Sequence, residues 1–319
     1  MTTWPPLLVA VVVVPILGAV LTPVVGQWRA RRAADWALGT MLLTSVVALL
    51  LVARVADGGP FSYVAGGWEV PYGIELRFDE FSAVTAIICL LGVLAIVFSR
   101  RYAEHALPEV RIPYYYALLL LNLAGMLGFS ITGDLFNLFV FMEILSLSGY
   151  ALVAVSGEKI AEMAAFKYLV MGAVSSIAVL FAIGMLYALT GSLNMADVAS
   201  RLGGAPVAPV AVAFGMMALG FMVKAAIFPL HIWLPDAHAI APSPVSAILS
   251  GLVVKVGIVG MLRLYQIAYT SRALDLEALN TVLMWLGALS IVMGAFFAVF
   301  QDDVKMMLAY STISNIGYI

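Results

Sequence analysis

Two lysines lie inside long apolar stretches of this sequence, where a charged side chain needs an explanation. Lys224 ends the run AVAFGMMALGFMVK, and Lys255 lies in the run SAILSGLVVKVGIVG. A lysine at bilayer depth costs at least about 2.5–3.5 kcal/mol on insertion scales, and such residues are usually functional. The two amines therefore indicate an ion path.

The segment between these lysines predicts a broken membrane helix. It contains four prolines, two histidines and an aspartate: Pro229, Pro235, Pro242, Pro244, His231, His238 and Asp236. Proline removes a backbone donor and interrupts the helical hydrogen bonds. In a bilayer, the freed backbone groups are tolerated only where protein or a water-filled cavity satisfies them.

A carboxylate, Glu143, lies near the middle of another apolar segment, GDLFNLFVFMEILSLSGYALVA. The small residues of SLSG follow it, which favours close helix packing over exposure to lipid. One interpretation is a structural ion pair with Lys224, because buried pairs can specify packing. That interpretation leaves Lys255 without a partner. The other is a proton relay, in which the distance to the carboxylate switches a lysine between its charged and neutral forms.

Five more residues are candidate accessory groups of such a path: Lys167, His231, His238, Asp236 and Lys305. Lys167 lies about five residues into the sixth apolar segment, near its inner end. The two histidines flank the hinge, where they either bond loop carbonyls or admit protons. Asp236 is expected to cap or brace the hinge. Asp134 is expected to be the N-cap of the segment that carries Glu143.

The composition is that of an integral membrane protein. Of 319 residues, 64% are hydrophobic and 11% charged, whereas soluble domains carry about 25% charged residues. No lysine or arginine precedes Arg29, so the N-terminal apolar run is predicted to be a membrane helix rather than a secretory signal.

Cysteine and histidine counts limit the redox chemistry of the chain. There is one cysteine, Cys89, which excludes a Cys-ligated iron–sulfur cluster, a CxxCH haem site and an internal disulfide. The three histidines, with His105 as the third, are predicted in loops or at helix ends, which does not suit a bis-histidine haem. We expect no cofactor, no metal and no catalytic redox centre in this chain, and no nucleic-acid partner.

Apolar runs of about 20 residues predict ten transmembrane segments. They cover residues 5–25, 35–54, 79–99, 113–131, 134–155, 162–190, 207–229, 244–268, 278–300 and 303–319. The alternating pattern of 58–79 predicts a small β-hairpin, and 191–204 predicts a short amphipathic helix along the membrane surface.

Lysine and arginine positions predict the orientation. With the N-terminus outside, nine of these residues fall on the inner side and five on the outer side, leaving Lys224 and Lys255 in the interior. The inner set is Arg29, Arg31, Arg32, Arg100, Arg101, Arg111, Lys159, Lys167 and Lys305; the outer set is Arg54, Arg77, Arg201, Arg263 and Arg272.

Four stretches resemble the antiporter-like membrane subunits of respiratory complex I and of Mrp-type multisubunit cation/proton antiporters. They are TGDLFNLFVFMEILSLSGYALVA (132–154), AEMAAFKYLV (161–170), the segment 222–263 and DDVKMMLAYSTISNIGY (302–318). GSLNMADVA and ITGDLFNLFVF lean toward the Mrp D-type subunit, whereas PLHIWLPDAHAIAP is shared with complex I and hydrogenase relatives.

The resemblance implies an all-α bundle of about fourteen transmembrane helices with two inverted five-helix repeats, each containing a broken helix. It implies that Glu143 pairs with Lys224 of the broken seventh helix and that Lys255 passes protons onward. Residues 1–112 are then an N-terminal three-helix region, 113–268 the first repeat, and 269–319 the start of a second repeat that we expect to be truncated. Asp134 to Tyr150 and Asp302 to Tyr318 share the ends D…GY, which suggests a repeat offset of 168 residues.

These observations predict a multi-pass subunit of the plasma (inner) membrane of a prokaryote, with its N-terminus outside. It would translocate protons, with Na+/H+ antiport as one form of coupling, together with other membrane subunits. One alternative is a quinone-contacting membrane-arm subunit of an NADH-quinone oxidoreductase or membrane-bound hydrogenase. A structural scaffold is the third, and it would not need three buried charges.

Overall fold

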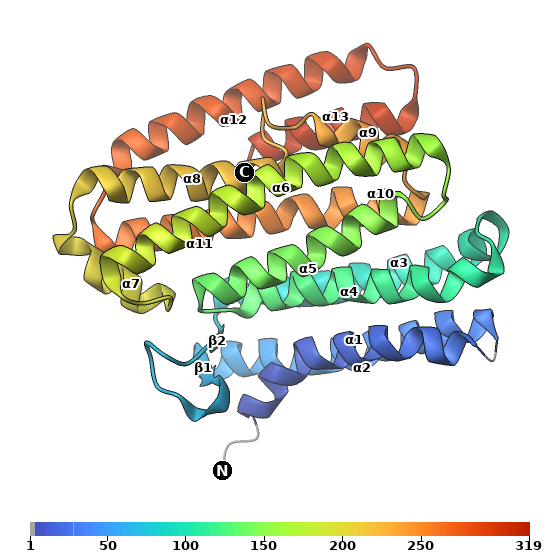
Figure 1. The fold of residues 1–319 in the computed structure, drawn as a ribbon, viewed down its shortest axis with the longest axis horizontal. Helices are drawn as coiled ribbons and strands as arrows, with labels where there is room; N and C mark the ends of the chain where they lie inside the picture. The colour runs from blue at the N-terminus through green and yellow to red at the C-terminus, as the bar shows by residue number, and fades with distance from the viewer. Residues whose placement is uncertain (1–3, 28) are drawn as a thin grey trace.

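The structure is a computed structural model that describes residues 4–27 and 29–319, and it is helical apart from one hairpin (Figure 1). The helices are α1 (Trp4–Gly26), α2 (Ala30–Gly58), α3 (Val84–Ala106), α4 (Ile112–Ile131), α5 (Leu135–Val153), α6 (Lys159–Thr190), α7 (Met195–Arg201), α8 (Val207–Ala225), α9 (Trp233–Ile240), α10 (Ser243–Ile248), α11 (Val254–Ser271), α12 (Leu276–Val299) and α13 (Val304–Gly317). The predicted all-α membrane bundle is confirmed.

Nine helices in the described ranges are long and apolar enough to cross a membrane. They correspond to the first nine predicted segments. The tenth prediction, 303–319, contains α13, which has 14 residues, whereas a span needs about 20. Polar side chains mark several helix starts: Asp134, Asn194, Asp275 and Asp303 each accept a bond from a backbone N–H of the first turn.

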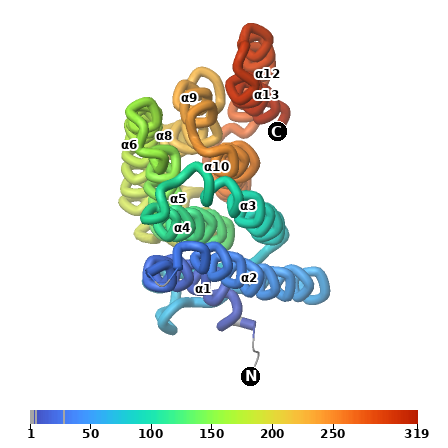
Figure 2. Tube along the Cα trace, turned by 90° about the vertical axis from the view of Figure 1, so that its right-hand side faces the viewer, coloured from blue at the N-terminus to red at the C-terminus, as the bar shows by residue number. Residues whose placement is uncertain are grey.

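The helices form layers, with α1 and α2 at one side of the bundle and α12 and α13 at the opposite side (Figure 2). Of the spanning helices, α4 is the most buried and α12 the least. The hairpin and α7 lie at the left end of Figure 1, and the α3–α4 and α12–α13 connections lie at the right end. Helix α4 packs mainly against α1 and α5, whereas α8 packs against α6 and α11.

Both predicted polar elements are present. Strand β1 (Phe61–Val64) pairs antiparallel with β2 (Glu75–Phe78), inside the segment whose alternation predicted a hairpin. Helix α7 lies within the predicted amphipathic stretch, and its N-cap Asn194 accepts bonds from the backbone N–H groups of Ala196 and Asp197. These elements cover the same end of the bundle.

The predicted broken helix is also confirmed, although its first half ends earlier than predicted. Helix α8 stops at Ala225, and Ala226 has φ 55°, a left-handed conformation that ends the helix four residues before the predicted 229. The chain turns through the proline-containing segment into α9. Trp233 Nε1 donates to the Val223 carbonyl at 2.8 Å, so a side chain satisfies one carbonyl near the break.

The next membrane span contains a second irregularity. Helices α10 and α11 are joined by a π-helical turn, Leu249–Val253, which ends two residues before Lys255. Such single π turns inside α-helices are rare and are frequent at functional sites. The apolar run alone did not predict it.

A buried ion pair fastens α11 to the start of α3. Arg263 Nη1 and Nη2 lie 2.5 and 2.8 Å from the two carboxylate oxygens of Asp79, and both side chains are more than nine-tenths buried. Arg263 also donates to Ser82 and to the Ser130 carbonyl. The charge count placed Arg263 on the outer side without indicating a partner, and the structure shows that its side chain is a buried clamp between α11 and the segment before α3.

This pair predicts a pH-dependent contribution to stability. Burial acts to raise the pKa of Asp79, but the hydrogen bonds and charge of Arg263, with bonds from Ser82, outweigh it and hold that pKa below its ordinary value. Arg263→Leu leaves the carboxylate buried without its partner, so we expect the free energy of unfolding to fall by about 3–5 kcal/mol at neutral pH. Denaturant unfolding of the protein in detergent measures it.

The sign of the pH effect follows from the depressed pKa. The pair stabilises the fold above the unfolded-state pKa of about 4, and this contribution is lost as the pH falls through the lower folded-state pKa. The difference between the wild type and Arg263→Leu should therefore shrink in acid. The control is Arg201→Leu, which removes a partly exposed pair with Asp197 and should cost about 1 kcal/mol or less. Equal losses of unfolding free energy in Arg263→Leu and Arg201→Leu would contradict the role of the Asp79–Arg263 pair as a stabilising clamp.

Candidate functional site

Lys224 is a buried ammonium group whose contacts are hydroxyl oxygens. It lies in the last turn of α8 and is 3% exposed. Its Nζ donates to Ser146 Oγ of α5 at 2.7 Å and to the Tyr168 hydroxyl of α6 at 3.3 Å. The rings of Tyr150 and Tyr168 lie 5.9 and 5.3 Å from it, within cation–π range. Neutral groups therefore hold a buried charge.

Glu143 lies on α5, three residues before Ser146, and is half-buried. Its carboxylate accepts a hydrogen bond from the Ser176 hydroxyl of α6. Residues three apart on a helix are neighbours on one face, so Glu143 and the serine that binds Lys224 share a face of α5. None of the ion pairs within 4.0 Å in the described ranges joins Glu143 to Lys224. The pair that the resemblance implied is thus not in direct contact in this structure, where Lys224 binds Ser146, one turn from Glu143 on the same helix.

Aromatic rings connect α9 to the Lys224 contacts. Tyr168 stacks on Trp233 with ring centroids 4.0 Å apart and an angle of 6°, and Tyr150 meets Tyr168 edge-on at 4.5 Å. Trp233 also donates to the carbonyl of Val223, the residue before Lys224. Helix α9 therefore contacts both Tyr168 and the end of α8. A movement of α9 would be transmitted to the hydroxyl that holds the ammonium.

Lys255 follows the π turn on the neighbouring helix. Its Nζ donates to the Ser250 carbonyl at 2.7 Å, and its side chain is half-buried. Two residues later, a Cβ on Gly257 would lie 2.5 Å from the backbone nitrogen of Ala225, so α11 and the end of α8 are in close contact. Lys224 and Lys255 each lie within two residues of this contact, so the fold places them at a similar position along the two helix axes.

Lys167 does not belong to this buried group. Its side chain is 56% exposed, and Nζ pairs with Asp236 Oδ2 at 2.5 Å. The pair joins α6 to α9. Asp236 thus braces the hinge, as predicted.

Lys305 of α13 contacts the C-terminal end of α9, and the two hinge histidines lie just before this helix (His231) and within it (His238). Lys305 Nζ donates to the carbonyls of Ala239 and Ala241 at 3.1 and 2.6 Å, where the helix dipole favours a positive charge. Both histidines are buried, at 9% exposed for His231 and 3% for His238. Within the described ranges, His231 Nδ1 and His238 Nε2 have no hydrogen-bond partner.

The family model described as "NADH:quinone oxidoreductase/Mrp antiporter, TM" matches residues 132–319, more than half of the chain. The chain belongs to this family. The matched region contains Glu143, Lys224, Lys255 and Lys305, so the candidate path of this family member lies inside it.

Relatives of this family member come from two kinds of complex. The N-type subunit of the NADH-quinone oxidoreductase of Desulforudis audaxviator is 40% identical over 278 residues, which cover 85% of this chain and 54% of the relative. The D-type subunit of the Na(+)/H(+) antiporter of Bacillus subtilis is 31% identical over 314 residues, 97% of this chain and 62% of the relative. The chain therefore spans just over half to under two thirds of these relatives.

A solved structure shows the same fold. A chain of the membrane-bound sulfane sulfur reductase, an archaeal respiratory membrane complex, superposes with a TM-score of 0.89 at 33% identity, covering 97% of this chain and 63% of that chain. The fold of this NADH:quinone oxidoreductase/Mrp family member is thus that of a subunit in a multisubunit membrane complex.

Several polar contacts of this family member were missed by sequence reasoning. Ser146 was predicted only as a packing residue, and Ser176, Tyr168 and Trp233 were not predicted in any role at the site. The signal available for Tyr168 was its position next to Lys167 in AEMAAFKYLV. For Ser176 there was no signal in the sequence, because serines are frequent in membrane helices and do not reveal which face they occupy.

Proposed function

We propose that this chain is a proton-translocating subunit of a multisubunit membrane complex. The observation that carries the proposal is Lys224, a buried ammonium group held by Ser146 and Tyr168 beside a helix break. A buried charge without a contacting carboxylate is costly, so small structural changes can shift its protonation. The hydroxyl groups can bind either form of the amine, since they both donate and accept.

Glu143 supplies the electrostatic control. At an effective dielectric of about 20, two unit charges attract by about 4 kcal/mol at 4 Å and about half as much at twice that distance. A movement of a few ångströms between Glu143 and Lys224 therefore changes the balance between ammonium and amine by about thirtyfold. Glu143 sets the charge of Lys224, and Lys255 on the adjoining helix receives the proton released.

Coupling to sodium transport or to a redox reaction is a property of the whole complex. The antiporter relative favours Na+/H+ antiport, and the oxidoreductase relative favours a redox-driven complex. The experiment is reconstitution of the complex into vesicles with an internal pH-sensitive dye. Proton movement that depends on this chain supports the proposal, and a complex that functions without any proton movement refutes it.

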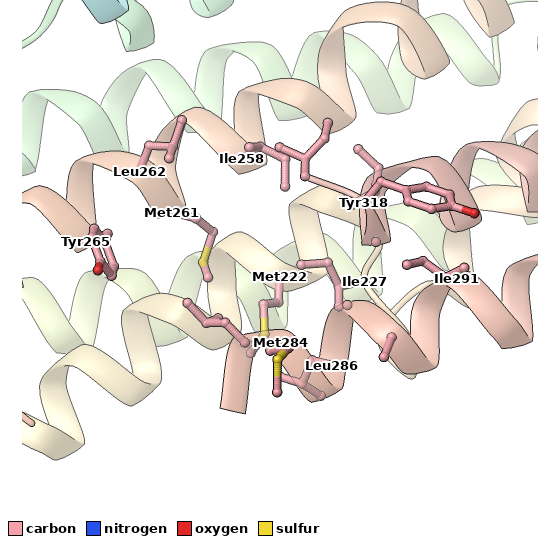
Figure 3. Close-up of a pocket in the computed structure, with 16 residues that line it drawn as sticks. Met222, Ile227, Ile258, Met261, Leu262, Tyr265, Met284, Leu286, Ile291 and Tyr318 are labelled. Atoms are coloured by element: carbon pink, nitrogen blue, oxygen red, sulfur yellow. The ribbon is translucent and has the colours of Figure 1, made fainter. Parts of the chain in front are cut away.

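Direct contact with quinone is the second candidate function, and one cavity has a size and lining relevant to it. A cavity of about 500 Å³ lies between α8, α11, α12 and α13. Met222, Met261 and Met284 point into it, with Tyr265 at its edge (Figure 3). The predominantly apolar lining suits a hydrocarbon tail. The polar contacts of Lys224 favour proton transfer as the main function.

We propose an orientation with the N-terminus outside, in a prokaryotic plasma membrane. Ser62→Cys in β1 should react with a membrane-impermeant thiol reagent added outside intact cells, and Ala106→Cys at the end of α3 should react only after permeabilisation. Both positions are exposed, whereas the native Cys89 is buried. Mass-tag detection on gels measures both. Reaction of Ala106→Cys alone in intact cells would reverse the orientation.

A further inference from the structure

Helices α5 and α13 begin in the same way. Asp134 accepts from the Asn137 N–H at 2.7 Å at the start of α5, and Asp303 accepts from the Met306 N–H at 2.9 Å at the start of α13. The two N-caps are 169 positions apart. The sequence pattern paired Asp134 with Asp302, but the capping geometry selects the next aspartate.

A close helix contact gives the same spacing. A Cβ on Gly125 of α4 would lie 2.7 Å from the Leu145 nitrogen of α5, and a Cβ on Gly294 of α12 would lie 2.5 Å from the Ser314 nitrogen of α13. Gly125 and Gly294 are 169 positions apart, and so are Leu145 and Ser314. The N-caps and the close helix contacts therefore both align the pair α4–α5 with the pair α12–α13 at an offset of 169 residues.

With this offset, the counterpart of Glu143 is Thr312. Thr312 is 6% exposed, and its Oγ1 lies 2.8 Å from Ser250 Oγ in the π turn. Thr312 also donates to the Leu308 carbonyl at 2.8 Å. A hydroxyl has a single proton to donate, so Ser250 is the donor in the contact and Thr312 the acceptor.

Ser250 is also the residue whose carbonyl accepts from Lys255 at 2.7 Å. A serine side chain inside a helix readily bonds back to a carbonyl one turn earlier when it has no other partner. If the π turn relaxed to α-helical hydrogen bonding, the Ser250 carbonyl would bond the Val254 N–H and would no longer face the lysine. The hydrogen bond between Ser250 and Thr312 of α13 opposes this relaxation.

We propose that Thr312 is a positioning residue for Lys255: it holds Ser250 in the π turn and keeps the Ser250 carbonyl directed at the ammonium group. The helix equivalent to the one that carries Glu143 thus acts on the second lysine, with a hydroxyl in place of a carboxylate. The importance of this contact for transport rests on the proposed function, whereas the contact itself does not.

Other charged groups surround Lys255 and stay unchanged in the test. His238 of α9 is near enough to interact electrostatically with both Lys255 and Lys305 of α13, and α8 contributes Lys224. Variants at Thr312 and Ser250 alter none of these groups. A change at Lys255 is therefore attributable to the hydroxyl contact.

The test compares Thr312→Val, which removes the hydroxyl at nearly constant volume, with Thr312→Ser, which keeps it. The readout is acylation of Lys255 by an amine-reactive reagent in the purified 319-residue protein, quantified by mass spectrometry relative to the exposed Lys159. Only the neutral amine reacts. Loss of the carbonyl contact disfavours the ammonium form, so Thr312→Val should raise the Lys255 to Lys159 ratio by about two- to tenfold, the factor expected for one hydrogen bond.

Ser250→Ala removes the same contact from the other side and keeps the carbonyl. It should raise the ratio as Thr312→Val does, and the double variant should show no larger effect, because both changes break one interaction. Equal ratios in Thr312→Val and Thr312→Ser, or multiplied effects in the double variant, would overturn the proposal. A raised ratio with unchanged proton flux in the reconstituted complex would support the positioning role and would refute the proposed role of Lys255 in transport.

Discussion

Lys224→Ala is expected to lower proton translocation by about a hundredfold or more, the usual contribution of a proton-transferring side chain, while the complex still assembles. Alanine removes the ammonium that Ser146 and Tyr168 hold, and those hydroxyls cannot carry a net proton in its place. Proton flux into vesicles containing the complex, measured with a pH-sensitive dye, gives the rate. Subunit content on a native gel reports assembly.

The matched control is Lys167→Ala. This lysine is exposed and paired with Asp236, so its loss weakens a brace between α6 and α9 without removing a buried charge. It should keep most of the wild-type flux. An assembled Lys224→Ala complex that pumps at the wild-type rate would show that protons bypass Lys224.

Glu143→Gln is the second change with a large expected effect. Glutamine has nearly the same shape, and its side-chain carbonyl can still accept from Ser176, so helix packing should be retained. The negative charge that controls Lys224 is lost, and flux in the same vesicle assay should fall by about a hundredfold.

Ser176→Ala separates the hydrogen bond from the charge. It removes the contact to Glu143 but leaves the carboxylate, so the expected loss of flux is about tenfold or less, the factor expected for one hydrogen bond. If Glu143→Gln and Ser176→Ala reduced flux equally, the hydrogen bond rather than the charge would be the essential feature of Glu143.

The sequence was sufficient to locate the residues that are energetically costly in a bilayer. Charged residues in apolar runs located Glu143, Lys224 and Lys255, and prolines located the helix break, because each has a high cost in hydrocarbon. The same reasoning did not reveal the partners of Lys167 and Arg263. Apolar neighbours along the chain do not show whether a side chain reaches solvent or a partner on a distant segment.

The contacts around the site depended on helix rotation, which the apolar sequences leave undetermined. Helix α5 is apolar on nearly all sides, so nothing in its sequence directs Ser146 toward Lys224. The π turn before Lys255 depends on a contact between Ser250 and α13, which is distant in the chain. The 168-residue offset of the sequence pattern differs by one from the offset of the N-caps, because Asp302 and Asp303 are adjacent and only the geometry shows which one caps α13.

The central claim is that the carboxylate of Glu143 controls the protonation of Lys224, and infrared difference spectroscopy tests it most directly. Spectra of the reconstituted complex are compared before and after it is energised. The predicted result is a carboxylate stretching band that shifts on energisation, is absent in Glu143→Gln and no longer shifts in Lys224→Ala. A band from Glu143 that responds to energisation equally with and without Lys224 would contradict the claim.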